Sequence, residues 1–125
     1  ISNNPGNAYE QLACGTFYSS GSITAASDVT AYSDARHKTN LIKIENALDK
    51  VNMLNGYTFT RTDMKDKEKR HVGVIAQEVL EVLPEAVTTR DNGYLAVDYQ
   101  KLIPLMIEAI KDLKSEIDEL KKSKG

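Results

Sequence analysis

Ser33 and Lys38 are the two residues of this sequence whose types and spacing could support a reaction. A serine hydroxyl is a weak nucleophile until a base removes its proton, and a lysine amine can be that base when burial lowers its pKa from about 10.4. The chain bends easily enough across this interval to bring the two side chains together. By spacing alone, the pair is still more simply explained as a loop serine and a solvated lysine before a helix.

Three other reactive side chains stand apart from this pair. Cys14 has no basic neighbour in sequence, so we expect a small packed side chain rather than a nucleophile. His37 and His71 lack the additional ligands that a metal site requires. Phosphate-binding loops and paired-carboxylate sites are also missing from the sequence, and we expect neither a metal nor a cofactor.

Length and charge restrict the possible partners. The chain has 125 residues, which is enough for one domain with a modest core and an appendage. Its formal net charge is −2, which argues against nucleic acid or an anionic membrane as a partner. No apolar run approaches the roughly 20 residues of a membrane span, and the N-terminus lacks the pattern of a signal peptide. The sequence therefore predicts a soluble segment of a longer polypeptide.

Composition changes sharply near Ser33. Residues 1–32 contain Glu10 and Asp28 but no Lys or Arg, whereas all sixteen basic residues follow Ser33. The first stretch is rich in Gly, Ser, Thr and Ala and predicts short strands and turns that bury almost nothing alone. Its backbone groups must then find partners in more upstream chain or in other copies of the chain.

Beyond this border the pattern predicts an α+β domain with a small antiparallel sheet and short helices. A helix is expected from Thr39 or Asn40, as the N-cap, to Asn55–Gly56, and the strand-like GYTFTRT follows it. HVGVIAQEVLEVL predicts a short strand that runs into an amphipathic helix closed by Pro84. A hairpin is expected about the Asn92–Gly93 turn.

The C-terminal segment predicts one long helix, about residues 100–123, with Pro104 in its first turn. Apolar residues alternate at spacings of three and four, and charged residues fill most of the positions between them. Such a heptad seam favours pairing with other helices over folding back onto its own domain. The predicted seam consists of Ile103, Met106, Ile110, Leu113, Ile117 and Leu120.

A family resemblance joins these features. SDARHKTNLIKIENALDKV, GVIAQEV, the DNGYLAVDY hairpin and the heptad terminus follow one another in order. Over about residues 22–122, the chain resembles the C-terminal intramolecular chaperone domain of bacteriophage tailspikes, tail fibres and neck appendages, also called the peptidase S74 family. The opening Ser-Asp-x-Arg-x-Lys and the Gly-Val-Ile-Ala-Gln-Glu-Val sequence are the most specific parts of this resemblance.

The resemblance implies a homotrimer that assists folding of an upstream triple β-helix or fibre and then cuts itself off. Ser33 would be the nucleophile and Lys38 its base, with Asp34 and Arg36 in supporting roles. Residues 1–33 would be the β-rich end of the fibre, and residues 34–125 the chaperone domain. The domain would act in the host cytoplasm during virion assembly, whereas the upstream product would join the virion tail.

The bond that breaks has two candidates beside Ser33. The resemblance favours Ser33–Asp34, whereas attack through a five-membered ring would cut Tyr32–Ser33. Ser27–Asp28 is an internal control, because it lacks the arginine and lysine of the motif and should not be cut. Two alternatives remain open: a serine hydrolase with external substrates, and a trimerisation or receptor-binding tip that never cleaves.

Overall fold

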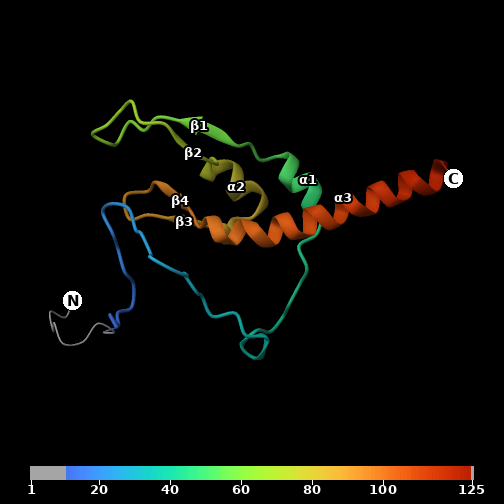
Figure 1. Cartoon of the computed structure of the whole chain (residues 1–125), viewed down its shortest axis with the longest axis horizontal. Coiled ribbons are helices and arrows are strands. Elements are labelled where there is room, and N and C mark those ends of the chain that lie inside the picture. The colour runs from blue at the N-terminus through green and yellow to red at the C-terminus, as the bar shows by residue number, and fades with distance from the viewer. Residues whose placement is uncertain (1–10, 125) are drawn as a thin grey trace. The chain divides into compact units, whose positions relative to one another are not determined.

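The computed structural model describes residues 11–124 and divides into two units, Ile1–Thr39 and Asn40–Gly125. Figure 1 traces the chain and labels the helices and strands of the second unit. Within the described part of the first unit, the one regular element is the 3₁₀ turn η1 (Ala35–His37).

Residues 11–34 adopt extended chain and bends without a helix or strand. The short strands predicted there do not form in the single chain, because no described segment of this unit offers backbone groups for pairing. Cys14 is exposed, so the packed environment expected for it is wrong for the single chain. Assignment of this stretch to the end of a fibre stays a prediction, and its residues 1–10 lie outside the described residues.

The second unit is a mixed α+β domain, as predicted. Its strands form two separate two-stranded antiparallel sheets, β1–β2 and β3–β4, instead of one small sheet. Each strand has only three residues, so each two-stranded sheet depends for its stability on packing against the rest of the domain. The elements follow in the order α1 (Ala47–Asn52), β1 (Tyr57–Phe59), β2 (His71–Gly73), α2 (Ala76–Val82), η2 (Pro84–Ala86), β3 (Val87–Thr89), β4 (Leu95–Val97), η3 (Tyr99–Lys101) and α3 (Leu102–Lys124).

Helix α1 begins later than the sequence predicted. Asn40 and Asn46 both have a φ of 54°, in the left-handed region that ends rather than continues a right-handed helix. Leu41, which lies within the predicted helix, is 75% exposed. The expected N-cap at Thr39 or Asn40 is therefore wrong.

The N-terminus of α1 is capped by a residue distant in sequence. Asn46 makes no side-chain hydrogen bond to the helix. Instead, a carboxylate oxygen of Asp112 in α3 accepts the backbone N–H of Leu48 at 3.3 Å. A negatively charged acceptor at this end satisfies an unpaired N–H group and suits the helix dipole. This contact stabilises the first turn of α1 and holds it beside α3.

The hairpin β3–β4 confirms the Asn92–Gly93 turn. Gly93 has a φ of 85°, a conformation that glycine adopts without steric cost. The carboxamide oxygen of Asn92 accepts the backbone N–H of Tyr94 at 3.1 Å. Val87 lies opposite Val97 in the register, and both pack against the core.

The core of the second unit lies where α1, α2 and the turn η2 meet the first half of α3 (Figure 1). Leu105 and Val79 are the largest side chains that are fully buried. Small residues at three of the core positions allow the short helices to approach α3 closely. The buried residues are Ala47, Val79, Val82, Leu83, Ala86, Leu102, Leu105 and Ala109.

Helix α3 has two apolar faces. Leu102, Leu105 and Ala109 are buried in the domain's own core. The six seam residues predicted from the heptad pattern lie on another face and are between 44% and 66% exposed. Folding of the single chain therefore uses a different face of α3 and leaves the seam uncovered. Within residues 11–124, no helix combines the length and apolar character that crossing a membrane requires.

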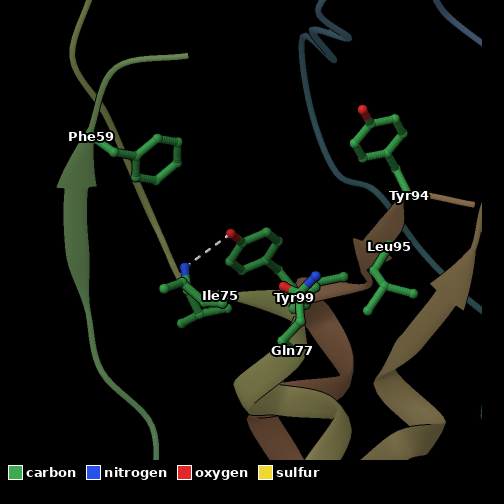
Figure 2. Close-up of a pocket in the computed structure, with 9 residues that line it drawn as sticks. Phe59, Ile75, Gln77, Tyr94, Leu95 and Tyr99 are labelled. Atoms are coloured by element: carbon green, nitrogen blue, oxygen red, sulfur yellow. Dashed lines mark hydrogen bonds between the residues drawn. The ribbon is translucent and has the colours of Figure 1, made fainter. Parts of the chain in front are cut away.

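Gly73 permits a close contact between the two hairpin regions. A Cβ atom at Gly73 would clash with the hydroxyl of Tyr99. That hydroxyl accepts the backbone N–H of Val74 at 3.2 Å, shown as the dashed line in Figure 2. The contact ties the end of β2 to η3, directly before α3 begins.

Replacing Gly73 with alanine is expected to lower the free energy of unfolding by about 1–3 kcal/mol, because the added methyl group displaces Tyr99 and breaks its hydrogen bond. Chemical denaturation followed by circular dichroism measures the change. Gly15→Ala is the matched control, because a Cβ there meets no heavy atom within 4 Å. Equal stability of the two variants would contradict this role for Gly73.

Candidate functional site

The first element of the candidate site is the turn η1. Asp34 is its N-cap, and one carboxylate oxygen accepts the backbone N–H of Arg36 at 2.8 Å. The Arg36 guanidinium returns to the same carboxylate through two hydrogen bonds of 3.1 and 2.9 Å. Bidentate pairing of this kind fixes the geometry of both side chains. Asp34 and Arg36 thus close a rigid turn between Ser33 and Lys38.

The turn brings Ser33 and Lys38 together. Lys38 is the C-cap of η1, and its backbone N–H donates to the carbonyl of Ala35. The Lys38 ammonium nitrogen Nζ lies 2.6 Å from Ser33 Oγ, with the amine as donor. All four motif residues that the sequence singled out here therefore meet within one short turn.

The charges of this turn are arranged around Asp34. Hydrogen bonds from the Arg36 guanidinium and then from the Arg36 backbone N–H hold the pKa of Asp34 below its usual 3.8. The same ion pair raises the pKa of Arg36. The carboxylate therefore contributes to the turn above pH 3.8, and this contribution is lost as pH falls through the lowered pKa. Both side chains are exposed, so solvent screens the pair.

This arrangement has the contact that nucleophilic catalysis needs. An amine within hydrogen-bond distance of a hydroxyl can take its proton when the amine is neutral. Ser33 and Lys38 are both exposed to solvent in the single chain. The geometry of a serine–lysine pair is thus present, whereas the described residues of this unit do not shield the pair from water.

The internal control differs in structure as well as in sequence. Ser27–Asp28 is followed by extended chain up to the motif, without a 3₁₀ turn. Thr30 and Tyr32 stand where Arg36 and Lys38 stand after Ser33. No basic side chain is therefore available locally to Ser27.

Glu78 is a structural residue that the sequence reasoning did not single out. Its two carboxylate oxygens accept hydrogen bonds from Asn55 Nδ2 and from the Tyr57 hydroxyl, both at 3.2 Å. Burial, followed by the nearby charge of Glu78, raises the pKa of Tyr57. These contacts connect α2 with the start of β1. A signal was available in the sequence, because Glu78 belongs to the GVIAQEV stretch.

The same stretch has structural roles at other positions. Gly73 lies against Tyr99, and Val79 is fully buried. GVIAQEV therefore positions the domain's elements, and it lies outside the turn that holds Ser33 and Lys38.

The remaining candidates do not form a reactive cluster. His37 lies in η1, whereas His71 lies in β2 and stacks on Phe59 with ring centroids 5.9 Å apart. Across residues 11–124, no three His, Cys, Asp or Glu side chains gather as metal ligands. A pocket of about 400 Å³ is lined mainly by aromatic and aliphatic side chains, including Phe59, Tyr94 and Tyr99 (Figure 2).

Comparison with known proteins agrees with the motifs. Residues 33–88 match the Peptidase_S74 family, described as "Chaperone of endosialidase". The match begins at Ser33 and ends within β3. It therefore contains the serine–lysine turn, α1, the first hairpin and α2.

Several curated relatives are long tail fiber proteins Gp37 of phages. The protein of Enterobacteria phage Ox2 is 40% identical over 124 residues, which cover 94% of this chain and 49% of that protein. That of Enterobacteria phage K3 is 39% identical over 112 residues, covering 85% and 9% respectively. For Salmonella phage S16 the identity is 33% over 103 residues, covering 76% and 14%. The chain spans about half or less of the length of these relatives.

The family match and the structure coincide on the same segment of chain. The matched residues open with the turn that joins Ser33 to Lys38, and they include the GVIAQEV stretch that holds β2 and α2 in place. Residues 33–88 of this chain therefore belong to the Peptidase S74 family, the chaperone of endosialidase.

Proposed function

We propose that this chain carries an intramolecular chaperone that trimerises, assists folding of the fibre segment upstream of it, and then releases itself by cutting beside Ser33. The single observation that carries the cleavage step is the 2.6 Å contact between Lys38 Nζ and Ser33 Oγ. Membership of a peptidase family whose match begins at Ser33 supports the same step. Similarity to phage long tail fiber proteins supports a fibre as the upstream segment.

The proposed reaction begins with the hydroxyl of Ser33. Its oxygen bonds to a backbone carbonyl carbon while its proton passes to the neutral Lys38 amine. The C–N bond of the peptide then breaks, and the leaving nitrogen takes a proton back from Lys38. Water hydrolyses the resulting ester, so that one peptide bond is exchanged for a carboxylate and an amine. Asp34 and Arg36 hold the turn that keeps the amine at the hydroxyl.

Two bonds remain candidates for the cut. Within one chain, the Ser33 oxygen reaches the preceding carbonyl through a five-membered ring, which would cut Tyr32–Ser33. The family resemblance favours Ser33–Asp34, where attack on the residue's own carbonyl would need a strained four-membered ring. Attack by Ser33 of another copy in the trimer avoids that strain. Mass spectrometry of the two fragments distinguishes the two bonds.

The proposed trimer rests on the uncovered seam of α3. Ile103, Ile110 and Ile117 occupy a positions, and the d positions carry methionine or leucine. Isoleucine at a with leucine at d favours two strands in isolated coiled coils. The number three comes from the family resemblance and from the threefold packing of the upstream fibre, and analytical ultracentrifugation tests it directly.

A trimer gives the upstream chain a folding advantage. Strands from three chains find their register slowly, because loop-closure entropy is lost before non-local contacts form. Association through the C-terminal domain raises the effective concentration of the three stalks. Release afterwards leaves a fibre that cannot easily unfold. On this proposal the domain acts in the host cell during assembly, and the upstream product becomes part of the virion tail.

The proposal predicts that Ser33→Ala leaves the full-length protein uncut, whereas wild type yields two fragments on a denaturing gel. The variant lacks the nucleophile but keeps the Asp34–Arg36 turn, so assembly should be unaffected. Ser27→Ala is the matched control, because Ser27 also precedes an aspartate and has no motif arginine or lysine. This control should be cut like wild type.

Two outcomes would count against the proposal. Equal cleavage of wild type and Ser33→Ala would exclude Ser33 as the nucleophile. A wild-type protein that assembles but stays whole would indicate a trimerisation or receptor-binding tip that does not cleave.

A further inference from the structure

An apolar pocket opens beside the first turns of α3. Its volume is about 260 Å³, below the roughly 300–1,000 Å³ of typical small-molecule sites. The size and the apolar lining suit a single aliphatic side chain better than a ligand. The pocket is lined by the end of α1, the loop after it, the residue that follows β2 and the start of α3, including Val51, Leu54, Gly56, Val74, Leu102 and Met106.

The pocket is continuous with the seam. Met106 lines the pocket and is also a d residue of the heptad pattern, 51% exposed. Leu102 lies at the preceding g position, on the side of the seam that faces the domain's own core. A second helix packed along the seam would therefore pass the mouth of this pocket.

Ile107 lies on the opposite side of the seam, at an e position. It is 52% exposed, although e positions of coiled coils usually carry charged residues. The next two e positions in α3 are Lys114 and Lys121, in keeping with that rule. Ile107 is therefore an aliphatic side chain at a position where the single chain gives it little to bury against.

In parallel coiled coils, the g residue of one helix lies near the following e residue of its neighbour. In this sequence, that relation pairs Leu102 with Ile107 of the next copy, and Glu116 with Lys121 of the next copy. The second pair has opposite charges. Among the described residues, neither Glu116 nor Lys121 forms an ion pair within the chain, whereas Lys114 pairs with Asp118 at 2.7 Å. Charge complementarity at the far end thus supports the same parallel register as the pocket.

We propose that Ile107 of each copy inserts into the pocket beside Leu102 and Leu54 of the neighbouring copy, so that each domain is clamped to the next outside the seam. The occupant is a second copy of this chain, and the inference rests on the proposed association through α3. The contact joins the folded domain of one copy to the helix of another. It therefore fixes the orientation of each domain about the coiled coil.

A disulfide experiment tests this contact. In a Cys14→Ser background, the pair Leu54→Cys and Ile107→Cys is oxidised and run on a non-reducing denaturing gel. A disulfide requires Cα atoms within about 7 Å, so cross-links between chains should appear and give covalent trimers. The matched control pairs Leu54→Cys with Lys114→Cys, one heptad further along the same side of α3, and should run as monomer.

The outcomes separate this contact from the association itself. Ultracentrifugation before oxidation shows whether each variant assembles, and Val51→Cys replaces Leu54→Cys if the latter does not fold. Assembled trimers that do not cross-link through Ile107, or that cross-link equally through Lys114, would overturn the clamp and leave the seam intact. A wild-type chain that is monomeric would overturn the association, and the clamp with it.

Discussion

Lys38→Arg is expected to reduce self-cleavage at least about 100-fold, to the range lost when a general base is removed. Arginine keeps the positive charge and the hydrogen-bond donors that face Ser33 Oγ. Its guanidinium does not release a proton near neutral pH, so it cannot accept the proton of the serine hydroxyl. The variant thus separates a base from a residue that merely donates a hydrogen bond. A time course of full-length protein on denaturing gels measures the rate.

The control for this variant is Lys43→Arg. Lys43 lies on the exposed segment before α1, and the same exchange there should leave the rate unchanged. Ultracentrifugation of both variants verifies that assembly is intact. Cleavage of Lys38→Arg at the wild-type rate would show that Lys38 serves only as a donor, and the base would then have to be another group.

Ile110→Asp is expected to convert the assembled chain into monomers of 13.9 kDa. Ile110 is 66% exposed in the single chain, so the domain tolerates a charge there. In an assembled seam, each copy would place an unpaired carboxylate among apolar side chains, at a cost of several kcal/mol. Ultracentrifugation measures the mass, and circular dichroism verifies that the helices remain.

Ser115→Asp is the matched control for the seam. Ser115 lies on the outer side of α3 and is exposed, so the same new charge there should leave the assembly intact. If Ile110→Asp remained assembled, the heptad seam would not be the interface. Because cleavage is proposed to follow assembly, Ile110→Asp should also slow the cutting of full-length protein.

Local signals were the ones that the sequence predicted well. The turn at Gly93, the helix closed before Pro84 and the position of α3 each depend on neighbouring residues or on a regular period. Spacing alone did not predict the contact of Ser33 with Lys38, which was expected only from the family resemblance. The structure forms it through a turn that Asp34 and Arg36 close. Turns and regular helices are determined by residues that are close in sequence, so a single segment is enough to predict them.

Contacts between distant residues were the ones that the sequence did not predict. The apolar spacing before Asn46 suggested a longer α1, but the actual start depends on a left-handed residue and on Asp112, which belongs to α3. The roles of Glu78 and Tyr99 likewise depend on partners in other elements. Neither periodicity nor propensity contains that information, because both describe one segment at a time.

The turn around Ser33 also bears on the timing of the proposed self-cleavage. The Ser33 hydroxyl and the Lys38 amine are already in contact in a single chain. On the proposed mechanism, an early cut would release the domain before the upstream fibre segment has folded. Distance between the two groups would not delay that cut, so the proposal assigns the delay to their exposure to solvent. On this proposal, the newly made protein would resemble a zymogen that has no pro-segment. It would become active when neighbouring chains exclude water from the turn that holds Ser33 and Lys38.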